Sequence, residues 1–219
     1  MAKAVIFDMD GVLIDSTKYI WKSFNQLLSK YNVQIPDDKV KKYLGRSLRD
    51  KIELWKKDYN IKEKIDPQEF SKSAFVLELK LMKKEVKPNQ HLQNLIKKLK
   101  QNKIKVAVAT SNYIPRASHI LELIQVKDKM DTITTLEEIQ HHKPHPEIFL
   151  KTAEKLEVKP EECIVIEDAV NGIEAAKKAN MKAIALLTKF HTREEFEKAD
   201  LIINSLSELT FEKIQALTL

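Results

Sequence analysis

The sequence predicts an α/β protein in which a doubly wound parallel sheet carries a helical domain inserted after the first strand. Three observations lead to this prediction. Short apolar runs rich in Val, Ile and Ala recur, stretches with helical spacing separate them, and the segment from about Ser16 to about Val86 holds no convincing strand. Continuous rather than alternating hydrophobicity is typical of strands covered on both faces, as in a parallel sheet. Alternation of such strands with helices predicts right-handed crossovers within one open, Rossmann-like sheet.

The predicted elements of the sheet domain follow from these runs. The strands are Ala4–Phe7, Ile104–Ala109, Asp131–Thr134, Cys163–Ile166, Lys182–Leu187 and Asp200–Ile203. Helical faces lie between them: one consists of Leu92, Leu95, Ile96 and Leu99, and a later one includes Ile173 and Ala176.

The inserted segment is predicted to be entirely helical. Its first helix carries an apolar stripe made of Ile20, Phe24, Leu27, Leu28 and Tyr31. Further helices are predicted over Asp37–Tyr43, Leu48–Asp58 and Pro67–Lys84, and Trp21 and Trp55 are expected to pack within this domain. With hinges near Asp15-Ser16 and Lys87-Pro88, residues 1–15 and 87–219 form the sheet core and residues 16–86 the helical domain.

Composition favours a globular protein of a reducing compartment. The 219 residues suit one domain or a core with a modest insertion, and 43% hydrophobic with 32% charged residues argue against disorder. The single cysteine, Cys163, excludes a disulfide framework and is expected to be a buried core residue. No uncharged run is long enough for a membrane span and no signal peptide is recognised, so we expect a cytoplasmic protein without membrane contact.

The net charge of +6 does not predict nucleic-acid binding. Only four of the 38 cations are arginine, and lysines are interleaved with acids, whereas nucleic-acid recognition favours clustered arginine. A modest positive field does favour small anionic substrates. With three glycines, the chain holds neither a P-loop nor a dinucleotide-binding glycine motif, which excludes P-loop hydrolases and most dinucleotide oxidoreductases.

Four polar clusters fall at the carboxyl end of a predicted strand or at the start of the crossover that follows one, where open α/β sheets bind ligands. They are Asp8-Met9-Asp10-Gly11-Val12, Thr110-Ser111-Asn112, Lys143-Pro144 and Glu167-Asp168. Each cluster alone has an ordinary structural alternative. The first could be an acidic turn, the second a helix cap and the fourth an N-cap pair. The third could be a surface lysine at the start of a helix with Pro144 or Pro146 near its first turn. Together they supply a pair of carboxylates, a hydroxyl, a lysine and an acidic pair with oxygen ligands suited to Mg²⁺.

In content and order these four clusters resemble the motifs of the haloacid dehalogenase superfamily. The resemblance extends from Lys3 to about Leu187, and the helical insertion resembles the α-helical cap of the family. Within the superfamily, Asp8-x-Asp-Gly-Val-x-x-Asp15-Ser16 and Glu167-Asp168-x-x-x-Gly172-Ile173 resemble the branch of β-phosphoglucomutase and phosphoglycolate phosphatase.

The resemblance implies a role for each cluster. Asp8 would attack phosphorus and form an aspartyl phosphate, and Asp10 would protonate the leaving oxygen and then accept a proton from water. Mg²⁺ would bind the carboxylates of Asp8 and Asp168 and the backbone carbonyl of Asp10, with Glu167 in an outer shell. The phosphoryl oxygens would be held by Thr110 and Lys143, with backbone N–H groups near Ser111 and Asn112 as helpers. An acid at position 10 favours phosphoryl transfer over dehalogenation.

The resemblance also bears on the substrate. In the mutases a cap histidine lies just downstream of the first motif, where this chain has Tyr19-Ile20-Trp21. The segment Gly45-Arg46-Ser47-Leu48-Arg49 resembles the substrate-specificity loop of the cap, so Arg46, Ser47 and Arg49 are candidate specificity residues, with a capped helix start as the alternative. A Schiff-base lysine in the cap, as in phosphonoacetaldehyde hydrolases, is a further and weaker alternative.

The function expected from the sequence is therefore that of a Mg²⁺-dependent phosphatase of small phosphorylated metabolites, of the sugar phosphate or phosphoglycolate type. A sugar-phosphate mutase is the alternative enzyme. The alternative of another class is a catalytically inactive protein that binds a phosphorylated ligand or nucleic acid. We expect a monomer or a homodimer.

Overall fold

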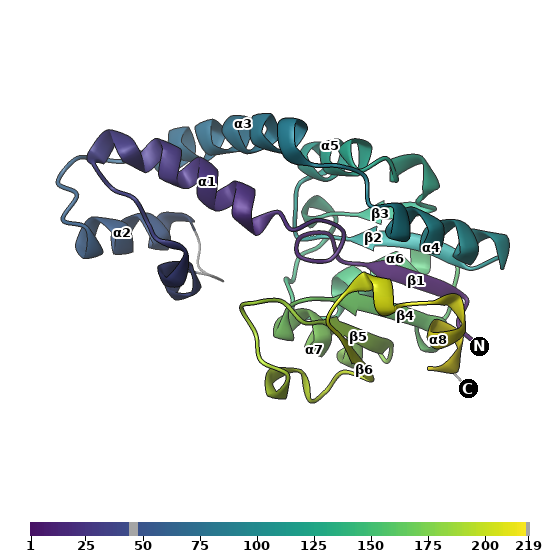
Figure 1. The fold of residues 1–219 in the computed structure, drawn as a ribbon. Helices are drawn as coiled ribbons and strands as arrows, with labels where there is room; N and C mark the ends of the chain where they lie inside the picture. Colours follow the sequence, from purple (N-terminus) through teal and green to yellow (C-terminus); the bar gives the residue numbers. More distant parts are fainter. Residues whose placement is uncertain (44–47, 218–219) are drawn as a thin grey trace. The chain divides into compact units, whose positions relative to one another are not determined.

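The computed structural model describes residues 1–43 and 48–217, and its chain divides into two compact units. The first unit comprises Met1–Asp15 and Lys87–Leu219, and the second comprises Ser16–Val86. Figure 1 shows the strands in the first unit and helices α1 to α3 in the second. Each unit is described by itself below.

A six-stranded parallel sheet forms the centre of the first unit, which confirms the predicted α/β class. The strands are β1 (Ala4–Phe7), β2 (Lys105–Ala109), β3 (Thr132–Thr134), β4 (Cys163–Glu167), β5 (Lys182–Leu186) and β6 (Leu201–Ile203), in the order β3-β2-β1-β4-β5-β6. Every predicted strand is present, with ends that differ by a residue at most. The strands are short and nearly free of charge in their interiors because the central ones are buried on both faces.

Helices cover this sheet. They are α4 (Gln90–Gln101), α5 (Ile114–Leu123), α6 (Glu147–Lys155), α7 (Val170–Lys178) and α8 (Phe211–Ala216), with 3₁₀ turns at Lys127–Lys129, Leu136–Glu138, Pro160–Glu162, Glu194–Phe196 and Leu206–Glu208. Helices α6 and α7 bury Ile148, Phe149 and Ile173 against alternate strand residues such as Ile6 and Val165. Cys163 belongs to the same cluster and is buried, as predicted.

The second unit contains helices and no strand among its described residues. Its elements are α1 (Thr17–Leu28), a 3₁₀ turn at Ser29–Tyr31, a 3₁₀ helix at Asp37–Tyr43, α2 (Leu48–Asp58) and α3 (Pro67–Glu85). The helix predicted over Asp37–Tyr43 is present with the same bounds and is a 3₁₀ helix, with tight turns such as the bond from the Lys39 N–H to the Pro36 carbonyl. Helix α3 starts where the Asp66 side chain accepts from the Glu69 N–H, 2.8 Å away.

Aromatic side chains make the core of the helical unit. Trp55 is fully buried and lies edge-on to Trp21, with ring centroids 6.1 Å apart, and Phe24 and Phe70 lie 5.5 and 5.7 Å from Trp55. Such edge-to-face pairs contribute about 1 kcal/mol each beyond the buried area. The packing of both tryptophans inside this unit confirms the prediction for them.

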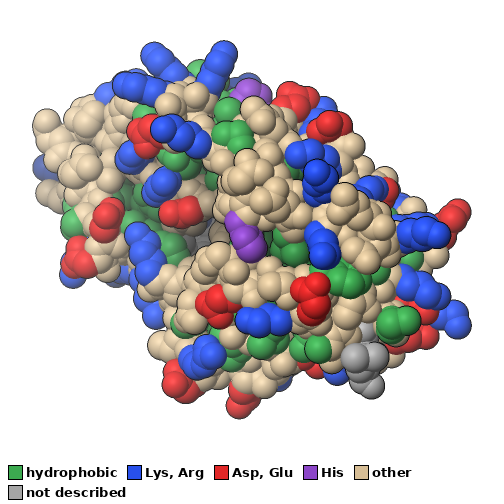
Figure 2. Space-filling model, turned by 45° about the vertical axis from the view of Figure 1, so that its right-hand side comes forward, with side chains coloured by type: hydrophobic (Ala, Val, Ile, Leu, Met, Phe, Trp, Pro, Cys, Tyr) green, Lys and Arg blue, Asp and Glu red, His purple; other side chains and the backbone are tan. Residues whose placement is uncertain are grey.

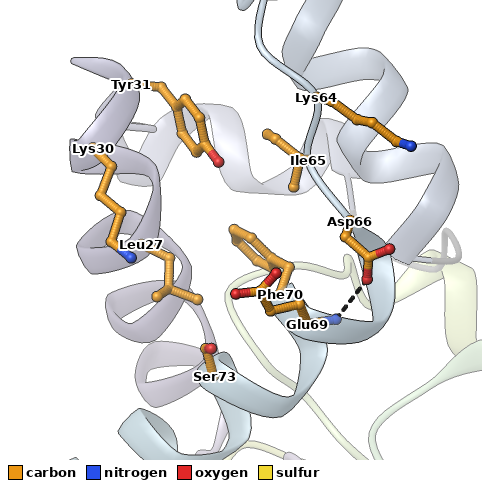
Figure 3. Close-up of a pocket in the computed structure, with 9 residues that line it drawn as sticks. All are labelled: Leu27, Lys30, Tyr31, Lys64, Ile65, Asp66, Glu69, Phe70 and Ser73. Carbon is orange, nitrogen blue, oxygen red and sulfur yellow. Dashed lines mark hydrogen bonds between the residues drawn. The ribbon is translucent and has the colours of Figure 1, made fainter.

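A cavity of about 300 Å³ lies within the helical unit. Figure 3 shows Leu27, Lys30 and Tyr31 on one side of it, facing Ile65 and Phe70. None of the residues in the four motifs lines this cavity, so it is separate from the site described next.

The surface and the helices bear on two further expectations. On the face drawn in Figure 2, Lys and Arg side chains lie among Asp and Glu side chains. Within residues 1–43 and 48–217, the helices are each too short or too polar to cross a bilayer.

Candidate active site

The sheet order places three motif-bearing strand ends side by side. Strand β1 pairs with β2 on one side and with β4 on the other, all parallel, so their carboxyl ends meet at one edge. Asp8 follows β1, Thr110 follows β2, and Glu167 is the last residue of β4. The chain runs from β1 outward through β2 and β3 and then crosses back to β4, which makes this edge the topological switch point of the sheet.

The backbone after β1 is shaped so that two carboxylates can approach each other. The N–H of Asp8 still donates to the Ile166 carbonyl on β4, at 2.9 Å, and the chain then turns at Gly11 with φ of 84°. A Cβ at Gly11 would lie 1.9 Å from Oδ2 of Asp168. Glycine is therefore required here both for the left-handed backbone and for the passage of the Asp168 side chain.

Lys143 is the buried cation of the site. Its side chain is 6% exposed, and its Nζ lies 2.5 Å from Oδ1 of Asp8 and 2.7 Å from Oε1 of Glu167. The ammonium also lies 5.0 Å from the ring centroid of Phe149. Although burial opposes the ammonium form, the two carboxylates raise the pKa of Lys143 above its ordinary value, so the lysine stays charged.

Lys143 lies in the loop just before the helix that was predicted to begin here with Pro144 or Pro146 near its first turn. Helix α6 begins only at Glu147, with Pro146 as its N-cap, and the Lys143–Pro144 peptide bond is cis. Of the two prolines expected near the first turn of this helix, Pro146 is the one that lies there, and Lys143-Pro144 belongs to the loop before it. The Glu147 carboxylate instead accepts the N–H groups of Gln140 and His141, at 3.1 and 2.8 Å, and these bonds lower its pKa to about 2. Glu147 thus closes the loop around Lys143.

The acidic pair after β4 is divided between two environments. Glu167 is buried, and its Oε2 accepts the backbone N–H groups of Asp168 and Ala169, both at 2.9 Å. A Cβ at Gly172 would lie 1.9 Å from Oε1 of Glu167, so the glycine in the motif makes room for this carboxylate. The N-cap of α7 is Ala169, without a side-chain cap bond, so Glu167 is held by the turn before the helix and by its direct bond to Lys143.

Three carboxylates converge on a position suited to a metal ion. Asp8, Glu167 and Asp168 each offer an oxygen, and these oxygens lie within 4.8 Å of one another. Burial, together with the charges of Glu167 and Asp8, raises the pKa of Asp168 to about 8. Burial likewise raises the pKa of Asp8, against the lowering effect of Lys143. A divalent cation bound here would stabilise the ionised form of these carboxylates, because it supplies the positive charge that the cluster lacks. A set of oxygen ligands alone matches the preference of Mg²⁺.

The second motif contributes one buried hydroxyl and one amide. Thr110 is 1% exposed, and its Oγ1 accepts from Nδ2 of Asn112 at 2.6 Å. The same Nδ2 donates to Oδ2 of Asp10 at 2.5 Å. Ser111 is exposed beside them. The structure therefore brings Asp8, Thr110 and Lys143 to one edge, and ties Asp10 to the second motif through Asn112.

One residue of the site was not found from the sequence. Arg116, on α5, places Nη1 2.9 Å from Oδ2 of Asp10 and Nη2 3.0 Å from Oδ1. Arg116 also donates to Oδ1 of Asn112, which lies before the N-cap of α5, so no helical spacing in the sequence indicates this contact.

The candidate specificity residues lie in the helical unit. Arg46 and Ser47 fall outside the described residues. Arg49 lies in the first turns of α2 and is exposed.

Comparison with known proteins places the chain in a family. A family model described as haloacid dehalogenase-like hydrolase matches residues 5–186. The chain is 29% identical to a phosphorylated carbohydrates phosphatase of Thermotoga maritima over 83% of each protein. It is also 29% identical to a β-phosphoglucomutase of Bacillus subtilis, over 96% of this chain and 92% of that protein.

Solved structures give the same picture. A crystal structure of β-phosphoglucomutase from Clostridium difficile is 28% identical, with a TM-score of 0.79 over 100% of this chain and 97% of that one. A family IA hydrolase from Entamoeba histolytica is 25% identical, with a TM-score of 0.83 over 100% and 99% of the two chains. The family model covers most of the chain, and the motifs that it spans meet at one sheet edge. This chain therefore belongs to the haloacid dehalogenase-like hydrolases, as its sequence motifs indicated.

Proposed function

We propose that this protein is a Mg²⁺-dependent phosphatase that hydrolyses phosphoric monoesters of small metabolites through a phosphorylated Asp8. The observation that carries the proposal is the position of Asp8, a buried carboxylate bonded to Lys143 within a cluster of three converging carboxylates. Relatives named as phosphatases of phosphorylated carbohydrates and hexitols support the choice of substrate class.

Asp8 is the proposed nucleophile. Its backbone is bonded to β4, so its carboxylate is held by the sheet. Attack of a carboxylate oxygen on phosphorus breaks the bond to the leaving oxygen and forms an acyl phosphate, which splits one difficult hydrolysis into two displacements.

Lys143 and Thr110 are the proposed binding groups for the phosphoryl oxygens, with the backbone near Ser111 and Asn112. Lys143 keeps its charge next to two carboxylates, and a buried cation beside the nucleophile lowers the repulsion between Asp8 and an incoming dianion. Thr110 supplies a hydroxyl at the end of the neighbouring strand.

Asp8, Glu167 and Asp168 are the proposed surroundings of Mg²⁺, together with the backbone carbonyl of Asp10. When bound, the ion neutralises negative charge on the phosphoryl group and on the carboxylates. Glu167 is already bonded to Lys143 and to two backbone N–H groups, which suits it to orient the site from outside the first coordination sphere.

Asp10 is the proposed proton carrier. It donates a proton to the leaving oxygen and takes one from the water that cleaves the acyl phosphate, so that it ends the cycle as it began.

The test is turnover of a generic aryl phosphate and of a panel of phosphorylated metabolites by wild type and Asp8→Asn, with and without Mg²⁺. We expect release of inorganic phosphate by wild type with Mg²⁺ and none by Asp8→Asn. Absence of turnover by wild type, or undiminished turnover by Asp8→Asn, contradicts the proposal. Binding of phosphorylated ligands without turnover supports the alternative of an inactive binding protein.

A mutase is the second candidate, because a relative and a solved structure over nearly the whole chain are β-phosphoglucomutases. The family resemblance implies a cap histidine in mutases just downstream of the first motif, where this chain has Tyr19-Ile20-Trp21, and this difference favours hydrolysis. Incubation with a hexose 1-phosphate separates the two: a phosphatase releases free phosphate, and a mutase yields the isomeric sugar phosphate.

Arg49 is the proposed contributor to substrate choice among the described residues of the helical unit, alongside Arg46 and Ser47. For Arg49→Ala we expect a raised KM for the preferred metabolite and an unchanged rate with a small aryl phosphate. An equal loss with both substrates contradicts a role in specificity.

A further inference from the structure

Asp10 has a charged partner that none of the four motifs contains. The guanidinium of Arg116 meets both oxygens of the Asp10 carboxylate, Nη1 to Oδ2 at 2.9 Å and Nη2 to Oδ1 at 3.0 Å. The Arg116 side chain is only 13% exposed, so solvent screens this pair less than a surface ion pair. Two parallel charge-assisted bonds fix the plane of a carboxylate as well as its position.

Asn112 completes the arrangement. Its Nδ2 donates to Oδ2 of Asp10, and its Oδ1 accepts from Nη1 of Arg116, so the three side chains form a closed ring of bonds. The ring joins the turn after β1, the turn after β2 and the first helical turn of α5. Three elements of the fold thus converge on the orientation of one carboxylate.

Asp10 pairs with a different cation from the one that pairs with Asp8 and Glu167. Asp8, Asp10, Glu167 and Asp168 bring four carboxylates, and Lys143 bonds to Asp8 and Glu167. Arg116 is the cation that the structure pairs with Asp10. Lys143 is the proposed cation for the phosphoryl group. Arg116, which bonds to Asp10, therefore has a different role.

We propose that Arg116 is a positioning residue that holds the Asp10 carboxyl group in line for proton transfer. This inference rests on the proposed function. In the first half-reaction a proton passes from the Asp10 carboxyl to the leaving oxygen as its bond to phosphorus breaks. In the second half-reaction a proton passes from the attacking water to Asp10 as the bond to Asp8 breaks. Arg116 stays charged throughout and exchanges no proton. The rate of proton transfer depends strongly on the position of the donor. Loss of the two bonds from Arg116 to Asp10 therefore lowers the rate, although no reacting group is removed.

The experiment uses Arg116→Met and two substrates that differ in their need for an acid. The dinitrophenolate of dinitrophenyl phosphate departs without being protonated. The alcohol of an alkyl phosphate, such as a hexose 6-phosphate, needs a proton on its oxygen to depart. In stopped-flow measurements of Arg116→Met we expect the first turnover of dinitrophenyl phosphate to stay within about twofold of wild type. The first turnover of the alkyl phosphate is expected to fall about tenfold or more. Steady-state turnover of both is expected to fall because water attack still needs Asp10, so a burst of dinitrophenolate appears or grows.

Two variants serve as comparisons. Arg116→Lys can bond to only one oxygen at a time, so we expect its alkyl phosphate rate to lie between wild type and Arg116→Met. Arg193→Met removes an exposed arginine of the same unit and is expected to leave both rates unchanged. Far-ultraviolet circular dichroism and the melting temperature check that each variant is folded.

The outcomes separate this inference from the proposed function. Equal losses in the first turnover of both substrates mean that Arg116 supports phosphate binding or the whole site, and overturn the positioning role. Unchanged rates overturn it as well. If wild type transfers no phosphate at all, the proposed function fails, and crystal structures of wild type and Arg116→Met then decide. An Asp10 carboxylate that keeps its plane and its bond to Asn112 in the variant overturns the inference, whereas a rotated carboxylate beside an intact Asp8–Lys143 pair supports it.

Discussion

The two units of this chain differ in where their charge and their chemistry lie. The helical unit, Ser16–Val86, carries 17 Lys and Arg against 10 Asp and Glu, whereas the sheet unit carries 21 against 22. The whole positive excess of the chain thus belongs to the helical unit. The strands and all four motifs belong to the nearly neutral sheet unit, where the largely buried Lys143 and Arg116 bond to individual carboxylates.

The difference shows two ways of using charge. In the sheet unit, cations such as Lys143 and Arg116 are largely buried and each bonds to defined carboxylates. In the helical unit most lysines lie on the surface, where they contribute a diffuse field that favours anions at long range and is screened by salt. Substitutions should therefore have large and local effects in the first unit and small effects in the second.

The largest effect is expected for Lys143→Met. This variant leaves Asp8 and Glu167 buried without their cation, so we expect turnover to fall about a thousandfold and the free energy of unfolding of the sheet unit to fall by about 3 kcal/mol. Phosphate release and urea unfolding measure the two effects. Lys62→Met, at an exposed lysine of the helical unit, is the control and should change neither by a measurable amount. Similar effects of the two variants would erase the contrast between the units.

A smaller effect is expected for Gly172→Ala. The added Cβ would lie 1.9 Å from Oε1 of Glu167, so the carboxylate must move and its bond to Lys143 must lengthen. We expect a loss of about 2 kcal/mol in the free energy of unfolding, with reduced turnover. Asn171→Ala, at the exposed neighbouring position on α7, is the matched control. A Gly172→Ala protein as stable as this control would show that Glu167 is not confined as described.

Magnesium is expected to act on the sheet unit with a defined pH dependence. The pKa of Asp168 is raised to about 8, so ionisation costs more in the folded than in the unfolded protein, and metal-free stability falls as the pH rises from about 4 to about 8. Protons compete with the ion for this carboxylate, so Mg²⁺ affinity should rise about fiftyfold between about pH 6 and pH 8. Calorimetric titration measures it, and Asp168→Asn should reduce the dependence to the smaller part that comes from Asp8. An affinity that is equal at both pH values would contradict the assignment.

The smallest effect is expected for Trp55→Phe in the helical unit. The substitution loses buried area but also removes a buried indole N–H that has no partner among the described residues, so we expect a loss of about 1 kcal/mol. Both tryptophans of the chain lie in this unit, so the fluorescence of Trp21 reports its unfolding in the variant. The first turnover of dinitrophenyl phosphate should not change. A change in that rate would mean that the packing of Trp55 influences the chemistry in the sheet unit.

Much of the sheet unit could be predicted because its signals are local. Continuous apolar runs identify buried parallel strands, and the strands are present within a residue of the predicted ends. A parallel sheet then brings polar residues at the strand ends together whatever their distance along the chain, which is why Asp8, Thr110 and Glu167 could be grouped.

The remaining features depend on side-chain paths that no local pattern reveals. Arg116 reaches Asp10 from a helix more than one hundred residues away, and only the tertiary approach of the first turn of α5 to the turn after β1 makes that pair possible. The loop before α6 depends on Glu147 folding back onto two backbone N–H groups. The type of helix at Asp37–Tyr43 likewise depends on packing within the helical unit.

The backbone bond from Asp8 to Ile166 has a consequence for dynamics. This amide, like that of Thr110 bonded to the Thr134 carbonyl, belongs to the hydrogen-bonded ladder of a buried sheet, although it lies just beyond the strand. Both amides should exchange with deuterium only when the sheet opens as a whole, among the slowest in the chain. The carboxylate of Asp8, the proposed nucleophile, would then lie at one of the most rigid points of the sheet unit, with its mobility confined to side-chain torsions.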